Sequence, residues 1–269
     1  MGYSVFIIGN GFDLNLGLST SYKDYMSSDF FKRNLCSGNE LFDYLDSKTS
    51  IENWIDIEKE LSVASKTGIS SYSSFFKEYK LLCSELINYL STVDVSSLNR
   101  ESEAYKFLER SFNENTLILN FNYTDSVKSI LRGSGFSESL ISRNVKHVHG
   151  SIEGGDIIFG VDDNSRIDPD HTFLYKSTSN IYDGRICRAS LKEFNDLFIF
   201  GHSLGESDHM YFDFFHDLCI FEDFEKKVTL FYYKDEGKHM LYKQLHALTS
   251  NKVSRLKSNV NFEEVDLSM

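Results

Sequence analysis

The sequence predicts an α/β protein with a Rossmann-like, mostly parallel sheet, helices on both faces and a large helical insertion after the first strand. Short apolar runs of strand length, rich in β-branched and aromatic residues, recur along the 269 residues. Segments with helical periodicity separate most of these runs, and strands that alternate with helices are typical of a parallel sheet. The first two runs are about a hundred residues apart, far more than a crossover helix needs.

The first expected strand covers residues 4–9 (SVFIIG), an apolar run that ends in glycine and suits a buried parallel strand. Further runs of this character cover, in chain order, residues 116–121, 145–148, 157–159, 196–200, 228–233 and 260–262.

The long interval after the first strand is predicted to be helical. Apolar residues between Tyr72 and Leu90 recur at steps of three and four, which marks one apolar stripe on a long helix. Shorter helices are expected over residues 51–64 and 104–112. We therefore predict a single α/β domain over residues 1–269, in which residues 20–113 form a helical insertion packed over one edge or mouth of the sheet.

Composition limits the classes of function. Lys and Arg total 28 against 40 Asp and Glu, which gives a net charge of −12. A surface this acidic repels phosphate backbones, so binding of duplex nucleic acid is disfavoured. The content of 41% hydrophobic and 14% aromatic residues is enough for a packed core, which excludes a disordered chain.

Localisation and zinc binding are predicted from what the sequence lacks. No segment reaches the ~18–20 apolar residues of a membrane span, and the start, MGYSVFIIGNGFD, has no basic region typical of a signal peptide. We therefore expect a cytoplasmic protein with no membrane contact. The four cysteines are far apart and form no CxxC pair, so a structural zinc site is not expected.

The first candidate site is Gly9-Asn10-Gly11-Phe12-Asp13, directly after the first strand. Glycines at the carboxyl end of a strand allow backbone N–H groups to approach a phosphate. The spacing differs from the GxGxxG fingerprint, so an ordinary tight turn is the alternative interpretation. The position favours a ligand, because open α/β sheets bind ligands where their strands end.

The second candidate site is NFNYTD at residues 120–125, which follows the next strand. Asn and Asp at such a turn can cap the helix expected to begin near Ser126. Two asparagines and an aspartate exceed what a cap requires, which favours a functional role.

The third candidate site is His147-Val148-His149-Gly150. Strand alternation places both histidines on the same face, yet no further metal-ligand pattern accompanies them, so we expect no metal. A histidine at a strand end suits a general base, because its pKa lies near neutrality.

The fourth candidate site, GHSLGESD at residues 201–208, matches the G-x-S-x-G nucleophile elbow of α/β-hydrolases. Ser203 would be the nucleophile. No HGGG segment precedes the motif, so a serine hydrolase is the alternative hypothesis. Its triad partners would come from Asp217, Asp223 or Asp235 with His239 or His246.

Asp56 and Glu58 form a fifth candidate pair beside Trp54, the only tryptophan. Residues two apart do not share a helix face, so joint acid–base chemistry requires a helix that begins here. Solvated surface carboxylates are the default expectation.

Together, these motifs resemble the AbiH-type bacteriophage abortive-infection family, which is in turn similar to sirtuin-like NAD-binding domains. The resemblance spans nearly the whole chain. The residues that carry it are IIGNGFDLNLGLSTSYKDY, NWIDIE, NFNYTD, HVHGS, IIFGVDD and GHSLGESDHMYF.

The resemblance implies roles for individual residues. Asn122 would orient the nicotinamide ribose, Asp13 would assist at the ribose, and His149 would be the general base. The implied nucleotide-binding residues are Gly9, Asn10, Gly11, Phe12, Asn120, Tyr123, Thr124, Gly150, Gly201, His202, Ser203 and Asp208. Thr124 stands where the sirtuin-like pattern has Asp, with Asp125 one residue later.

The function implied is anti-phage defence through binding of NAD, or a related nucleotide, and hydrolysis of its nicotinamide–ribose bond. NAD would be the substrate, and no cofactor or metal is required. The cysteine quartet of a sirtuin zinc module is missing, so protein deacylation is not expected. The expected partners are a nucleotide and a phage-derived trigger or partner protein. A serine hydrolase and a non-catalytic nucleotide sensor are the alternatives.

Overall fold

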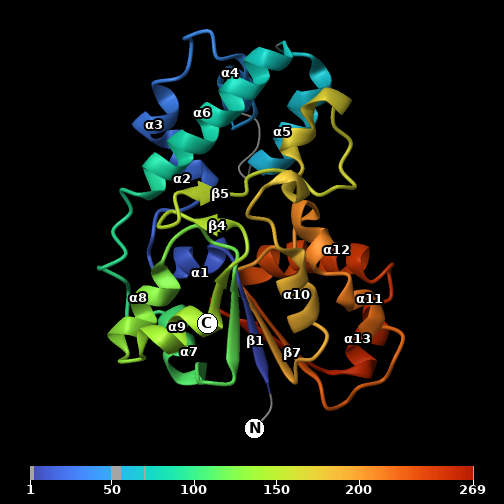
Figure 1. The fold of residues 1–269 in the computed structure, drawn as a ribbon. Coiled ribbons are helices and arrows are strands. Elements are labelled where there is room, and N and C mark those ends of the chain that lie inside the picture. The colour runs from blue at the N-terminus through green and yellow to red at the C-terminus, as the bar shows by residue number, and fades with distance from the viewer. Residues whose placement is uncertain (1–2, 50–55, 70, 269) are drawn as a thin grey trace.

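A computed structural model describes residues 3–49, 56–69 and 71–268. Its main sheet has six parallel strands in the order β3-β2-β1-β6-β7-β8 (Figure 1). The strands are β1 (Ser4–Ile8), β2 (Thr116–Asn120), β3 (Val145–His147), β6 (Asp196–Phe200), β7 (Lys227–Tyr232) and β8 (Asn261–Asp266).

The strand order is that of a doubly wound Rossmann sheet, because the chain adds β2 and β3 on one side of β1 and then β6, β7 and β8 on the other. The predicted α/β fold class is therefore confirmed. The order of strands reverses between β1 and β6, and their last residues, Ile8 and Phe200, pair in register. Ile8 also pairs with Asn120 at the end of β2, so the turns that follow these three strands meet.

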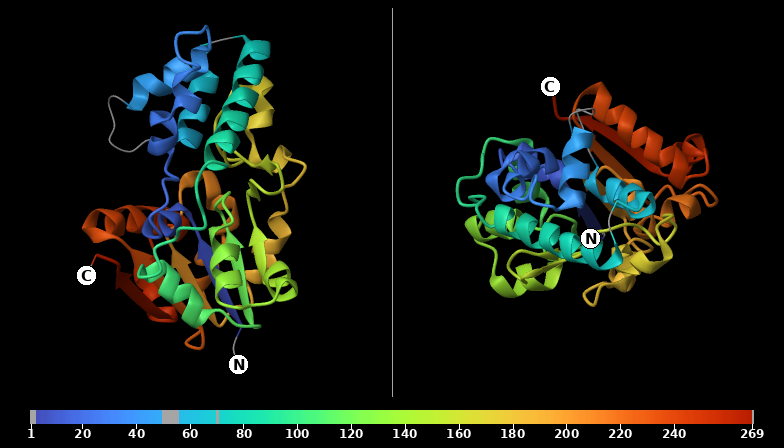
Figure 2. Two further views of the ribbon diagram at one scale, coloured as in Figure 1. Left: turned by 90° about the vertical axis from the view of Figure 1, so that its left-hand side faces the viewer. Right: turned by 90° about the horizontal axis from the view of Figure 1, so that it is seen from above.

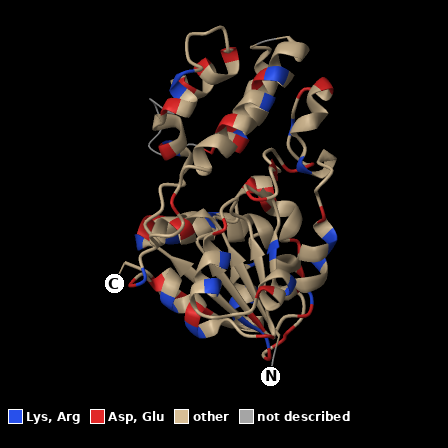
Figure 3. Cartoon of the chain, turned by 60° about the vertical axis from the view of Figure 1, so that its left-hand side comes forward, with Lys and Arg blue, Asp and Glu red and all other residues tan. Residues whose placement is uncertain are grey.

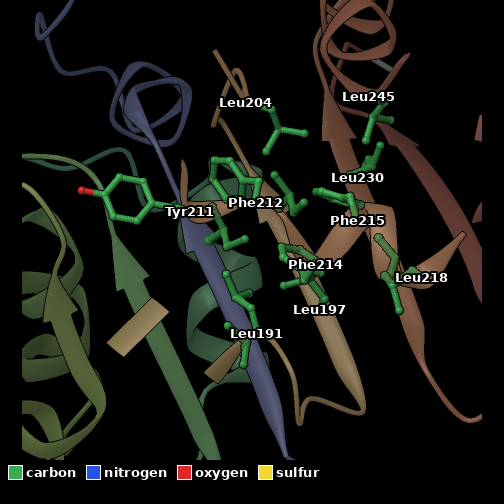
Figure 4. Packing of buried hydrophobic residues seen from close by; sticks show 14 of the residues in the cluster. Leu191, Leu197, Leu204, Tyr211, Phe212, Phe214, Phe215, Leu218, Leu230 and Leu245 are labelled. Carbon is green, nitrogen blue, oxygen red and sulfur yellow. The ribbon is translucent and has the colours of Figure 1, made fainter. Parts of the chain in front are cut away.

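Helices cover both faces of the sheet. Successive side chains of β1 point to opposite faces and therefore enter two separate cores. Phe6 and Ile8 belong to one hydrophobic core, while Val5 and Ile7 belong to another. The first core is covered by α1 (Asn10–Asn15), α7 (Glu103–Ser111), α8 (Ser126–Gly133) and α9 (Glu138–Asn144). The second is covered by α10 (Gly184–Ser190), α11 (Phe214–Leu218), α12 (Lys234–Leu248) and α13 (Val253–Asn259). Figure 4 shows how closely the second core is filled.

Five helices extend beyond the carboxyl end of the sheet and form what we call the helical lobe (Figures 1 and 2). They are α2 (Tyr22–Ser27), α3 (Asp29–Lys32), α4 (Glu40–Thr49), α5 (Ile57–Thr67) and α6 (Tyr72–Leu90). The lobe has its own core, which includes Phe31, Phe42 and Leu82. We call the sheet with its covering helices the body.

The predicted helices match the observed ones closely. The apolar stripe at 72–90 is α6, and the helix expected over 104–112 is α7, although α7 packs on the sheet rather than in the lobe. The helix expected over 51–64 is α5, which begins at Ile57 with Asp56 as its N-cap. Residues 51–55 lie outside the described residues.

A segment that we call the strap, residues 157–178, connects the two parts. It begins at the last residue of β5 (Asp156–Ile157), which pairs with β4 (Gly150–Ser151) in a separate antiparallel sheet. The run predicted at 157–159 therefore does not extend the main sheet. The strap contains the 3-10 helices η1 (Pro169–Leu174) and η2 (Lys176–Thr178). Its apolar residues Phe159, Val161 and Leu174 are buried in the core of the lobe.

Charged residues of both signs are interspersed along the ribbon of lobe and body (Figure 3). The described part of the chain contains no helix that is both long and apolar enough to cross a bilayer.

The turn after β1 packs directly against the turn after β6. The Gly11 N–H donates to the Gly201 carbonyl at 2.8 Å, and the Gly9 N–H donates to the Phe200 carbonyl at 3.1 Å. A Cβ on Gly201 would lie 2.1 Å from the Phe12 nitrogen, and Gly201 has a φ of +67°. Backbone contact at the point where the strand order reverses therefore requires glycine here.

Substitution of Gly201 tests this contact. We expect Gly201→Ala to lower the free energy of unfolding by about 3 kcal/mol or more, because it adds a backbone clash to the left-handed conformation, which by itself costs about 1–2 kcal/mol. Gly135→Ala is the matched control, since Gly135 has a φ of +84° but open space around its Cβ position. Urea denaturation measures both, and equal losses would contradict the packing role.

Candidate functional site

A buried ion cluster lies beyond the carboxyl ends of the strands, between lobe and body. Its centre is the Lys176 ammonium, which is 3.0 Å from Glu58 Oε2 and 2.6 Å from Asp208 Oδ1. Lys176 is 1% exposed and belongs to η2 in the strap. Glu58 belongs to α5 in the lobe, and Asp208 belongs to the 3-10 helix η3 (Glu206–Tyr211) in the body.

Two histidines complete the cluster on the body side. His149 Nε2 lies 3.0 Å from Asp208 Oδ1, and His202 Nε2 lies 3.4 Å from Asp208 Oδ2. The Leu204 N–H donates to His202 Nδ1, which leaves the ring proton on the Nε2 that faces Asp208. The His149 contact is close but not aligned as a hydrogen bond, so His149 Nε2 is a buried polar atom without an aligned partner among the described residues.

Aromatic rings surround the histidines. Phe121 packs edge-on against His202 at 4.4 Å and against His149 at 5.1 Å between ring centroids. Tyr211 lies 5.7 Å from His149. These apolar walls exclude water, which strengthens every charge interaction inside the cluster.

The cluster separates the pKa values of its two carboxyl groups. Burial by itself raises the pKa of Asp208, but Lys176 and the two histidines outweigh it and hold that pKa well below its usual range. For Glu58 burial dominates over the attraction of Lys176 and raises the pKa to about 7. A pair of acids separated in this way is typical of sites that need one ionised and one protonatable group.

His149 is neutral at physiological pH. Burial lowers the pKa of its imidazole to about 4, and the nearby Lys176 charge acts in the same direction. Asp208 opposes this shift without reversing it. The ring is therefore an uncharged imidazole held beside an ionised carboxylate, and a pKa of about 4 makes it a weak base as long as it stays buried.

The polar groups predicted as a site in the first turn are bonded to other groups of the protein. The Phe12 N–H donates to the Gly9 carbonyl, and Asn10 Oδ1 accepts from the Thr20 hydroxyl at 2.7 Å. Asp13 is fully buried, and its carboxylate accepts the hydroxyl groups of Thr124 and Ser126, both at 2.5 Å. Asp13 thus clamps α1 to the turn after β2, and its catalytic role stays a prediction.

The NFNYTD turn is organised around backbone groups. The Asn122 side chain donates to the Gly9 carbonyl at 3.1 Å, and its N–H donates to the Asn120 side chain. The Tyr123 hydroxyl donates to the Ile158 carbonyl at 3.0 Å. Asp125 precedes α8 but makes no side-chain cap; capping therefore does not explain its presence.

His147 and His149 belong to separate networks. His147 bonds the Asn122 carbonyl through Nδ1 and Asp125 Oδ1 through Nε2, at 3.0 and 3.1 Å, whereas His149 faces Asp208. The strand β3 ends at His147, so the alternation expected to place both rings together does not reach His149. Within the described segments, no group of three or more His, Cys, Asp or Glu residues is arranged to hold a metal ion.

The turn after β6 does not form a nucleophile elbow. Ser203 is exposed, and the positive φ values fall on Gly201 and Leu204 instead. The candidate bases His239 and His246 are exposed on α12, and neither bonds the Ser203 hydroxyl in the described part of the chain. The hypothesis of a Ser203 triad lacks the geometry it needs.

The sequence did not predict Lys176 as a site residue, and it offered Glu58 only as a candidate with surface solvation as the default expectation. Glu58 is 6% exposed, so the default expectation of a solvated carboxylate is wrong. The signal for Glu58 was the motif NWIDIE, where the helix does begin. The segment FLYKSTS around Lys176 carries no comparable signal, because a single lysine in a loop is expected to be exposed on the surface.

A family model described as "Bacteriophage abortive infection AbiH" matches residues 5–233. The chain belongs to the AbiH family. The matched range contains Glu58, His149, Lys176 and Asp208, whereas β8 lies beyond it. AbiH membership supports a role in abortive infection, the anti-phage function of the family, and confirms the predicted resemblance. No curated protein and no solved structure matches the chain.

Lys176 is the first target in this AbiH protein. We expect Lys176→Met to lower the free energy of unfolding by about 3–5 kcal/mol, because it leaves two buried carboxylates without their cation. Lys59→Met, an exposed position next to Glu58 on α5, should change stability by less than about 0.5 kcal/mol. Chemical denaturation measures both variants. Similar losses would show that the buried cation is not needed.

The pH dependence of stability tests the surroundings of Glu58. Its pKa is raised from 4.5 to about 7 in the folded protein, so between these values the folded state holds a proton that the unfolded state releases. Stability from this group is therefore lost as pH rises through that window. Glu58→Gln does not titrate, so its free energy of unfolding should gain on that of the wild type from about pH 5 to about pH 7. Urea denaturation at each pH measures the free energy of unfolding of both proteins. A difference between them that stays constant from pH 5 to pH 7 would contradict the prediction.

Proposed function

We propose that this protein defends against phage by hydrolysing the nicotinamide–ribose bond of NAD or a related nucleotide, with His149 as the general base. The single observation that carries the proposal is a neutral His149 next to an ionised Asp208, at the carboxyl edge of a Rossmann sheet.

The position of the cluster supports a nucleotide ligand. In doubly wound sheets, ligands bind outside the carboxyl ends of the strands, at the point where the strand order reverses. Here that point lies between β1 and β6. His202 follows β6 and Asn122 follows β2, and Asn122 bonds the carbonyl of Gly9 after β1. His149 follows the edge strand β3, and its Nε2 lies 3.0 Å from Asp208, which follows β6; this position at the carboxyl edge of the sheet supports the proposal of a nucleotide ligand.

The chemistry follows from the charges. In the proposed reaction, the bond between ribose C1′ and the nicotinamide nitrogen breaks, and its electron pair leaves with neutral nicotinamide. Water adds its oxygen to C1′, and its proton passes to the imidazole of His149 and then to solvent. The products are nicotinamide, ADP-ribose and a proton.

Asp208 has two roles in this proposal. Its carboxylate lies 3.0 Å from His149 Nε2, where its charge stabilises the imidazolium that forms. The same negative charge, in water-poor surroundings, stabilises an oxocarbenium-like transition state. Lys176 is a positioning residue, because its ammonium keeps Asp208 ionised.

Release of nicotinamide from NAD, followed by chromatography, tests the proposal. We expect His149→Ala to lower the rate by about 10²–10⁴-fold, the usual contribution of a general base, and Asp208→Asn to lower it in the same direction. His239→Ala, an exposed histidine on α12, is the matched control and should retain the wild-type rate.

Three outcomes would overturn the proposal. Absence of nicotinamide release, with purified protein and with extract of phage-infected cells, would exclude the reaction. Tight nucleotide binding in calorimetry with intact ligand recovered would instead indicate a non-catalytic sensor. Labelling of Ser203 by a fluorophosphonate would favour a serine hydrolase.

A further inference from the structure

The strap packs against the helical lobe. The Tyr79 hydroxyl of α6 donates to the Phe159 carbonyl at 2.6 Å. Ser65 of α5 accepts from the Asp168 N–H and bonds His171, both at 2.9 Å. Because the strap also contributes apolar residues to the core of the lobe, separating the two would unfold that core.

Polar and charged contacts join the lobe and strap to η3 of the body. From the lobe, Glu58 Oε2 accepts the Ser207 hydroxyl at 2.7 Å. From the strap, Lys176 contacts Asp208 at 2.6 Å, and Asp162 Oδ2 accepts the Met210 N–H at 2.8 Å. Lys176 also contacts Glu58, so one ammonium connects lobe, strap and body.

These contacts cover the candidate base. His149 is 4% exposed and Asp208 is 8% exposed, which leaves too little surface for a substrate to touch either side chain. A nucleotide reaches His149 only if the lobe and strap move away from η3. Such a movement must separate the Lys176 ammonium from Asp208 and the Glu58 carboxylate from Ser207.

We infer that the Glu58–Lys176–Asp208 bridge is an autoinhibitory latch that holds the helical lobe closed over His149. That this contact inhibits the protein rests on the proposed function. The closed contact itself does not depend on that function. Opening the latch exposes the site.

The chemistry of the contact suits reversible opening. Water solvates three charged groups as soon as they separate, and this offsets much of the attraction lost, so a buried ion pair contributes little net stability. An apolar interface of equal area has no such compensation. The attraction nevertheless depends steeply on distance and geometry in apolar surroundings, so the bridge defines one closed arrangement.

Hydrogen–deuterium exchange of the full-length protein, read by mass spectrometry, tests the latch. Glu58→Gln weakens the charge contact with Lys176. We expect peptides that contain residues 158–162 and 205–212 to exchange faster by about tenfold or more, the effect of one charge-assisted hydrogen bond. Peptides from β1 and α6 should keep their wild-type protection, because the cores of body and lobe stay intact.

Glu85→Gln is the matched control. Glu85 is buried on α6 and pairs with Arg33 inside the lobe, so its loss should leave residues 205–212 protected. Ser207→Ala is the second variant, which removes only the hydroxyl donated to Glu58 and should accelerate the same peptides by a smaller factor. It keeps the test decisive if Glu58→Gln does not fold.

Unchanged exchange at 205–212 in both Glu58→Gln and Ser207→Ala would overturn the latch. So would equal acceleration in β1 and α6, which indicates general unfolding. Nicotinamide release measured on the same samples separates the two proposals. Faster exchange without any release would remove the proposed function and leave the latch, whereas release with unchanged exchange would remove the latch alone.

Discussion

One buried ammonium determines how the parts of this protein are held together. Lys176 lies between two carboxylates, one from the helical lobe and one from the body. Without it, the ionised Asp208 would be buried with no cation beside it, which is strongly destabilising, and burial would hold Glu58 in its protonated form. The ionisation of Asp208 depends on that charge, and the same charge adds to the effect of burial that keeps His149 neutral.

The Rossmann order explains why the cluster forms at this place. The parallel register brings the ends of β1, β2 and β6 level, and the glycine turns after β1 and β6 then pack backbone to backbone. The glycines thus serve the fold as well as any ligand. A glycine-rich turn at a strand end can serve a ligand or the fold. The Gly11 N–H donates to the Gly201 carbonyl at 2.8 Å, and a Cβ on either glycine would clash with the other turn, which supports the structural role.

The apolar surroundings that shift the pKa values of the cluster are the same surroundings that close it to substrate. Apolar walls and excluded water are what move the pKa values of Glu58 and His149. The same walls prevent a substrate from entering. A site of this kind can act only if it opens, and a charged contact at its entrance is well suited to opening because water solvates the separated ions. For a protein of abortive infection, such closure offers a physical basis for inactivity before infection.

The sequence by itself determined the local structure. Apolar runs located the strands of the main sheet, periodicity located α6, and strand-end motifs identified His149 and the turn that carries Asp208. Only the tertiary structure decided which side chains meet. Lys176 is 118 residues from Glu58 and 32 from Asp208, and no local pattern records that the lobe packs against η3. For the same reason the sequence did not show that Asp13 bonds the hydroxyl groups of Thr124 and Ser126. Periodicity reports which face of an element is apolar, whereas the partner of a buried charge is decided by how distant elements pack.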